Sequence, residues 1–253
     1  MKWTYTESGN SNAPLLIFVH GGGVGGWMWD RQVESFQHYH CLVPELAESE
    51  QPDTKPMFTI EQSARQLIDL AKQKGAGRPI YAVGFSLGAQ IVIQMMNDSP
   101  HLLRGAMLNS ASVAPLPFAD RMIGPMVRCS FPLIRNRRFS ALQAKALYIP
   151  SEQFETYYAH SLKSSQDALI RMLRQSLTYR LPAGFSRSNA RVLVTVGEKE
   201  KRIMRKSAEQ IASIHPKAQK KILPGIGHGI PSAQPECFNT ILREWLEEGE
   251  ERK

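Results

Sequence analysis

Short apolar runs alternate with segments of helical periodicity along most of the chain. Leu15 to Val19 is continuously apolar and too short for a helix, which is typical of a strand buried on both faces of a parallel sheet. The run from Val192 to Val196 is rich in β-branched residues, which favours the same assignment. The predicted strands are residues 15–19, 41–43, 80–83, 105–108, 192–196 and 220–223.

Helical patterns fill the intervals between these strands. The clearest begins at Thr59, where a hydroxyl residue followed three positions later by Gln62 has the pattern of a capping box. The predicted helices are residues 27–39, 60–75, 87–97, 203–214 and 235–248. Strands that alternate with helices require crossover connections, so we expect an α/β fold with a parallel sheet.

The stretch 113–188 interrupts this alternation. It shows no strand pattern, and we expect helix broken by Pro125 and Pro132, then further helices opened near Pro150 and by Ser164 or Ser165. The sequence therefore predicts a core formed by residues 1–112 and 189–253, with residues 113–188 as a helical insertion.

The positive charge of the chain lies mostly in this stretch. The 253 residues carry a formal net charge of +8, and residues 111–190, with 11 Lys or Arg and four Asp or Glu, carry +7 of it. Such a segment can attract an anionic substrate or an anionic membrane surface, or can simply be a solvated helix face. No basic stripe interleaved with aromatic residues is present, so no nucleic-acid partner is predicted.

Cysteine usage and the apolar runs suggest a cellular setting. Cys41, Cys129 and Cys237 are odd in number and far apart, which favours reduced thiols over a disulfide framework or a metal clip. The first ten residues lack the apolar centre of a signal peptide, and no apolar run is long enough for a membrane span. We expect a cytoplasmic protein; the sequence does not indicate its oligomeric state.

A candidate nucleophile lies between the predicted strand 80–83 and the helix 87–97. Gly84-Phe85-Ser86-Leu87-Gly88 has the Gly-x-Ser-x-Gly pattern of a nucleophile elbow, a turn so tight that side chains at both glycine positions would clash. Ser86 would lie at a helix N-terminus, where free N–H groups favour a developing negative charge.

A serine hydroxyl needs a base, and the base needs an orienting carboxylate. His228 lies in a glycine-rich loop after the last predicted strand, at the edge of the sheet where α/β proteins bind ligands. The loop after strand 192–196 supplies the acid: Glu200 is preferred and Glu198 is the alternative. Lys199 and Lys201, with Arg202, would favour the ionised form of either carboxyl.

An oxyanion formed at Ser86 also needs hydrogen-bond donors. The backbone N–H of Leu87, directly after the nucleophile, is one candidate, and the loop after strand 15–19 offers a second, Gly22 or alternatively Gly23. This glycine loop lacks both the Walker ending and the spacing of a dinucleotide-binding turn.

Taken together, these motifs resemble the α/β-hydrolase superfamily in its serine-nucleophile, lid-containing branch. The chain order Ser86, Glu200, His228 matches the family order of nucleophile, acid and histidine. The resemblance implies an eight-stranded, mostly parallel sheet and a lid at the position of the basic insertion. It implies Ser86 as the nucleophile toward a small acyl substrate, with no metal and no organic cofactor.

Two positions depart from the pattern of many relatives. Position 200 is Glu where they often have Asp, and the segment from Pro44 to Ser49 lacks their glycines. Serine at position 86 argues against dehalogenases and epoxide hydrolases, which use a carboxylate nucleophile. The leading prediction is a carboxylesterase-like serine hydrolase. The alternatives are an acyltransferase, perhydrolase or carbon–carbon hydrolase with the same triad, and a ligand-binding signalling protein.

Overall fold

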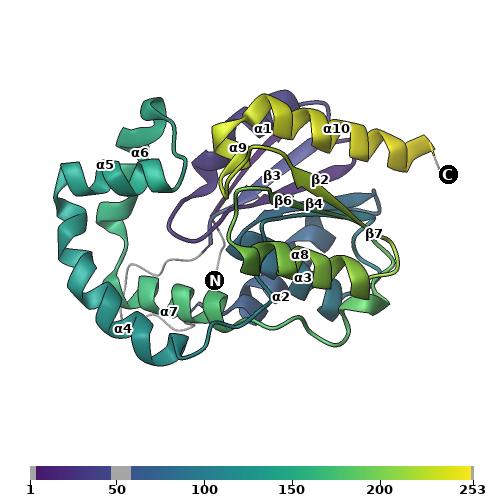
Figure 1. Cartoon of the computed structure of the whole chain (residues 1–253). Coiled ribbons are helices and arrows are strands. Elements are labelled where there is room, and N and C mark those ends of the chain that lie inside the picture. The colour runs from purple at the N-terminus through teal and green to yellow at the C-terminus, as the bar shows by residue number, and fades with distance from the viewer. Residues whose placement is uncertain (1–3, 47–57, 252–253) are drawn as a thin grey trace.

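Seven strands form a single sheet in the computed structural model, which describes residues 4–46 and 58–251 (Figure 1). Every neighbouring pair is parallel except β1 and β3, as the sequence predicts for its central strands. Seven strands are therefore present in the described part, where the family resemblance implies eight. Their spatial order is β1 (Tyr5–Gly9), β3 (His40–Pro44), β2 (Leu15–Val19), β4 (Ile80–Phe85), β5 (Gly105–Asn109), β6 (Arg191–Gly197) and β7 (Ala218–Leu223).

Strand β1 was not predicted, because its sequence carries no apolar run. It is an edge strand that pairs antiparallel with β3, from Tyr5 opposite Pro44 to Gly9 opposite His40. Four of its five residues are polar or glycine, and three are exposed. An edge strand with a solvated face needs few apolar residues, so periodicity does not reveal it.

Helices cover both faces of the sheet (Figure 1). Alternate residues of the fully buried strand β2 point to opposite sides: Leu15 and Ile17 join one apolar cluster, and Leu16 and Phe18 the other. The first cluster includes residues of α2 (Ile60–Gly75), α3 (Leu87–Asp98) and α8 (Arg202–Ile214); the second includes residues of α10 (Pro235–Glu251) and lies against α1 (Asp30–Ser35).

Two predicted helix starts are confirmed by their caps. The Thr59 hydroxyl accepts a hydrogen bond from Gln62 N–H at 3.0 Å, and that of Ser165 accepts one from Ala168 N–H at 3.1 Å. The helix expected over 27–39 is shorter, a 3₁₀ turn η1 (Gly26–Trp29) followed by α1. Helix α2 ends as its glycines suggest, with Ala76 left-handed at φ 47°.

The segment between β5 and β6 is helical and lies to one side of the sheet (Figure 1). We call α4 to α7 the helical insertion; its elements are α4 (Ala119–Ser130), η2 (Phe131–Arg135), α5 (Arg137–Ala146), η3 (Ser151–Gln153), α6 (Phe154–Lys163) and α7 (Gln166–Thr178). Helix α4 runs through Pro125, and the predicted break falls at η2, which contains Pro132. Two short elements remain, η4 (Phe185–Arg187) and α9 (Ile230–Ala233).

Among the described residues, none of the helices combines the length and the apolar character that crossing a bilayer requires.

Candidate active site

Ser86 lies at the turn between β4 and α3 in a strained conformation. Its φ of 54° and ψ of −114° place a non-glycine residue where few are found. Its N–H donates to Asn109 O on the neighbouring strand at 2.9 Å, which holds the turn in place. The backbone strain turns Ser86 out of the strand direction at the carboxyl edge of the sheet.

The two flanking glycines make this turn possible. A Cβ on Gly84 would lie 2.5 Å from Ala89 Cα, and one on Gly88 would lie 2.1 Å from Val19 O. Both neighbours are backbone atoms, which cannot rotate away as a side chain could. The structure therefore confirms the prediction that a side chain at either glycine position would clash.

We expect Gly88→Ala to lower the free energy of unfolding by about 3 kcal/mol or more, because β2 must move to admit the new methyl group. Urea denaturation measures this. Gly124→Ala is the matched control, also within a helix, where the added Cβ would meet only the mobile end of Arg174 at 3.3 Å. It should be neutral or stabilising by up to about 1 kcal/mol. Equal losses in both variants would contradict a steric requirement at Gly88.

His228 connects the serine to the acid. Its Nε2 lies 3.2 Å from Ser86 Oγ, and its Nδ1 lies 2.8 Å from Glu200 Oε2. Because an ionised carboxylate only accepts hydrogen bonds, Nδ1 carries the proton and Nε2 is free to accept from the serine hydroxyl. The His228 ring also packs on Phe85 with centroids 5.0 Å apart. The structure thus brings together the three residues predicted as nucleophile, base and acid.

Glu200, and not the alternative Glu198, contacts His228. The Glu200 side chain is 1% exposed, and its Oε1 accepts from Gly197 N–H at 2.9 Å and from Ser110 Oγ at 2.7 Å. Glu198 is exposed and accepts from Gly225 N–H at 2.8 Å, so it holds the loop that carries His228. The two carboxylates two residues apart have different structural partners.

The charge state of Glu200 follows from its surroundings. Burial acts to raise its pKa but is outweighed by hydrogen bonding and charge interaction with His228, together with hydrogen bonds from Gly197 and Ser110. The net effect is a pKa below the ordinary value. The cause differs from the sequence-based expectation, since Lys199, Lys201 and Arg202 are not among the groups responsible.

A pH dependence of stability follows with a defined sign. A carboxyl whose pKa is lower in the folded than in the unfolded state stabilises the fold above its unfolded pKa of about 4.3, and this contribution is lost as the pH falls through the folded value. The difference in unfolding free energy between the wild type and Glu200→Gln should therefore shrink between about pH 5 and pH 3. Urea titrations across this range measure it. A difference that widens toward low pH would contradict the assignment.

Ser110 is a site residue that sequence reasoning missed. It follows β5 with φ 55°, and its hydroxyl donates to Glu200 Oε1. No motif surrounds it, because its place depends on the pairing of β5 with β6. The positive φ of Ser110, directly after a buried strand, is known only from the structure.

The two residues predicted to supply oxyanion donors, Gly22 and Leu87, lie next to each other. A Cβ on Gly22 would lie 3.4 Å from Leu87 Cδ2 and 3.2 Å from Met172 Sδ of α7, whereas one on Gly23 would meet nothing within 4 Å. Neither Gly22 N–H nor Leu87 N–H donates to a backbone acceptor in the described part of the chain. Gly22 is therefore the glycine nearer to Leu87, and Met172 is a further neighbour of the site.

Buried His20 fixes the loop that carries Gly22. Leu46 N–H donates to His20 Nε2 at 3.0 Å, so the ring proton is on Nδ1, which donates to Gly21 O at 2.8 Å. Glu45 accepts from Gly26 N–H at 3.0 Å. The segment from Pro44 thus braces the glycine loop as far as Leu46; its remainder, from Ala47, lies outside the described residues.

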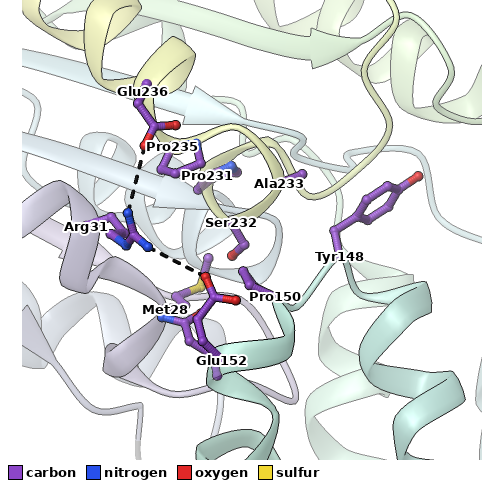
Figure 2. A pocket seen from close by; sticks show the side chains of 11 residues that line it. Met28, Arg31, Tyr148, Pro150, Glu152, Pro231, Ser232, Ala233, Pro235 and Glu236 are labelled. Carbon is purple, nitrogen blue, oxygen red and sulfur yellow. Dashed lines mark ion pairs between the residues drawn. The ribbon is translucent and has the colours of Figure 1, made fainter.

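Tyr148 of the insertion contacts the loop of His228. The backbone φ of Tyr148 is 60°. A Cβ built on Gly229 would lie 2.5 Å from the Cβ of Tyr148, and a Cβ built on Gly227 would overlap the Tyr148 hydroxyl. Tyr148 also borders a cavity of about 340 Å³ between α1, η3 and α9. Figure 2 shows Arg31 at this cavity, between Glu152 and Glu236. Its guanidinium nitrogens lie 3.6 Å from Glu152 Oε1 and 3.9 Å from Glu236 Oε1. None of the five predicted site residues lines it.

Residues 4–46 and 58–251 contain no group of three or more His, Cys, Asp or Glu side chains placed to hold a metal ion.

The mostly parallel sheet, the strained serine turn and the inserted helices together define an α/β-hydrolase fold. The chain belongs to the alpha/beta hydrolase family, whose model matches residues 16–236.

Named relatives and solved structures agree with this membership. The chain is 22% identical to Lipase 3 of Moraxella sp. (strain TA144), over 90% of this chain and 75% of that protein. It is 21% identical to Epoxide hydrolase 3 of Mus musculus, over 98% and 74% respectively. Its fold is similar to that of a thermophilic esterase from Thermogutta terrifontis, with a TM-score of 0.78, 21% identity and coverage of 98% and 93%.

Proposed function

We propose that this protein is a serine hydrolase that cleaves an ester or a related small acyl substrate through an acyl-enzyme. The observation that carries the proposal is the hydrogen-bonded series from Ser86 Oγ to His228 to buried Glu200, with distances of 3.2 Å and 2.8 Å. This is the arrangement that makes a serine hydroxyl nucleophilic.

In the proposed first half-reaction, Ser86 Oγ forms a bond to the acyl carbon while its proton passes to His228 Nε2. The carbonyl oxygen becomes an oxyanion, held by the N–H groups of Leu87 and Gly22. The tetrahedral intermediate then collapses: the bond to the leaving alcohol breaks, and His228 returns the proton to that alcohol. Glu200 stays ionised throughout and stabilises the imidazolium.

In the second half-reaction, water takes the place of the alcohol. His228 removes a proton from the water as its oxygen bonds to the acyl carbon, and the bond to Ser86 Oγ breaks as the proton passes to the serine. The acid is released and the free hydroxyl is restored. The 37% exposure of the His228 side chain leaves it open to this water.

The chemistry of position 86 separates this proposal from epoxide hydrolysis. A carboxylate nucleophile can form an ester with an epoxide carbon, whereas the Ser86 hydroxyl forms an ester only with an acyl donor. Similarity to an epoxide hydrolase at 21% identity therefore supports the shared fold and not that reaction.

We also propose that residues 113–188 form a cap over this site and that residues 1–112 and 189–253 form the core. Two contacts support this division. Met172 of α7 lies beside Gly22, and Tyr148 lies against the glycines on both sides of His228. A cap in this position would limit the size of the acyl group.

A fluorophosphonate probe together with a series of p-nitrophenyl esters of increasing acyl length tests the function. We expect the probe to add its mass to the peptide that contains Ser86, and turnover to vary with acyl length. Ser213→Ala, a change at an exposed serine of α8, should label like the wild type. Labelling at another residue, or at Ser86 with no turnover of any ester, would overturn the proposal. Product analysis with an added alcohol then separates hydrolysis from acyl transfer.

A further inference from the structure

Exposed apolar side chains are concentrated in the helical insertion and the residues that lead into it. Of the eleven large hydrophobic residues exposed in the described part of the chain, nine lie between positions 116 and 162. The same stretch has six Lys or Arg and three Asp or Glu, a net charge of +3. Scattered exposed apolar residues need no explanation, but a concentration of them in one small part of the fold marks an interaction surface.

Helix α4 arranges these residues as a stripe. Met122, Pro125, Met126 and Cys129 are all exposed, and at 3.6 residues per turn they fall within a sector of about 100°. Exposed Phe118 directly precedes the helix and begins the stripe. The other side of the helix is occupied, since Ala119, Ile123 and Val127 pack against Ile170 of α7. The helix therefore has two apolar sides, one packed on the protein and one in water. We call the exposed side the α4 stripe.

Arginines border the α4 stripe. Arg121 and Arg128 are exposed along one edge, and Arg135 and Arg138 follow within the next turns of chain. Among the described residues, none of these four forms an ion pair, whereas Arg137 pairs with Glu155. Asp120 lies on the opposite side of the helix from the stripe by the same periodicity. The stripe thus has a basic margin without local acidic partners.

The start of the stripe is held in an unusual backbone conformation. Phe118, 72% exposed, has a φ of 61° and a ψ of 10°, a left-handed conformation that is uncommon for an aromatic residue. Met122 and Met126, the next two large side chains of the stripe, are 63% and 55% exposed. A strained backbone at a projecting aromatic residue is more typical of a functional contact than of an idle surface.

We propose that the α4 stripe docks this protein onto the surface of an anionic lipid bilayer. Phe118, Met122 and Met126 would enter the boundary between headgroups and acyl chains, while Arg121 and Arg128 contact the phosphates. A soluble anion would use the arginines but leave the apolar stripe in water. A second copy of the chain would bring like charges together, which disfavours self-association.

Vesicle flotation tests this directly and does not depend on any enzymatic activity. The purified full-length protein is mixed with vesicles of phosphatidylcholine alone or of phosphatidylcholine with phosphatidylglycerol. We expect the protein to float with the anionic vesicles only, and added salt to release it. Arg121→Gln combined with Arg128→Gln should weaken binding about 30-fold, and Phe118→Ser combined with Met122→Ser at least about tenfold.

Matched controls come from the core. Arg65→Gln with Lys72→Gln makes the same change of charge on α2, and Ile214→Ser removes an apolar side chain that is 43% exposed. Both controls should bind vesicles like the wild type, and all variants should keep wild-type thermal unfolding, because the altered side chains are exposed.

Three results would overturn the proposal. The first is failure of the wild-type protein to float with anionic vesicles. The second is binding that the stripe and arginine variants leave unchanged. The third is a lower solution mass of Phe118→Ser with Met122→Ser by light scattering, together with unchanged vesicle binding, since this would assign the stripe to self-association.

Discussion

Ser86→Ala is expected to lower kcat for a p-nitrophenyl ester by about 10⁵-fold or more, because the acyl-enzyme can no longer form. The remaining rate would come from the oxyanion donors acting on direct attack by water, so KM should change little. Initial rates over a range of ester concentrations, with the amount of each enzyme taken from its absorbance, give both values. The strained turn should persist, since Ser86 N–H rather than the side chain holds it to Asn109 O.

Ser110→Ala is the matched control, because the Ser110 hydroxyl belongs to the same hydrogen-bond network and binds Glu200 instead of His228. Ser110→Ala removes a hydrogen bond to Glu200 and leaves the nucleophile in place, so its loss of rate should be far smaller. Losses of equal size in both variants would show that the measured activity depends on the network and not on Ser86 as nucleophile.

Glu200→Gln is expected to lower kcat by about 10⁴-fold. Oε1 already accepts two hydrogen bonds, from Gly197 N–H and Ser110 Oγ, so the amide oxygen takes that position and the NH₂ faces His228. His228 must then accept at Nδ1, which moves its proton to Nε2. An Nε2–H cannot accept from Ser86, and the base is lost with little change in shape.

Glu198→Gln is the matched control. The same change two residues earlier affects a side chain that accepts from Gly225 N–H and does not contact His228, so kcat should fall by less than about tenfold. Proton NMR of the imidazole N–H resonances would show the tautomer directly. A Glu200→Gln enzyme that keeps its rate, or a Glu198→Gln enzyme that loses it, would reverse the choice of acid.

The parts of the site that could be predicted from the sequence are those fixed by short-range geometry. Gly84 and Gly88 mark the turn because backbone atoms of other residues occupy the space that a side chain there would need. His228 follows the last strand within a few residues. The sequence favours Glu200 but leaves Glu198 as an alternative, since both lie in one loop and only its hydrogen bonds to residues 223–228 distinguish them.

Ser110 acts through long-range packing and could not be predicted. It reaches Glu200 because β5 pairs with β6, and its own position carries no local pattern. Strand β1 was not predicted for a related reason. It forms by pairing with β3, and its own residues show no strand pattern.

The contact of Tyr148 with Gly227 and Gly229 restricts which helical insertions from other family members can be joined to this core. The Cβ of Tyr148 itself would lie 2.5 Å from any Cβ at position 229, so rotating the ring cannot make room. A chimera that grafts a foreign insertion onto this core must keep a residue at 148 that fits between two glycines, or change both loops together. The insertion and the histidine loop therefore have to be exchanged together.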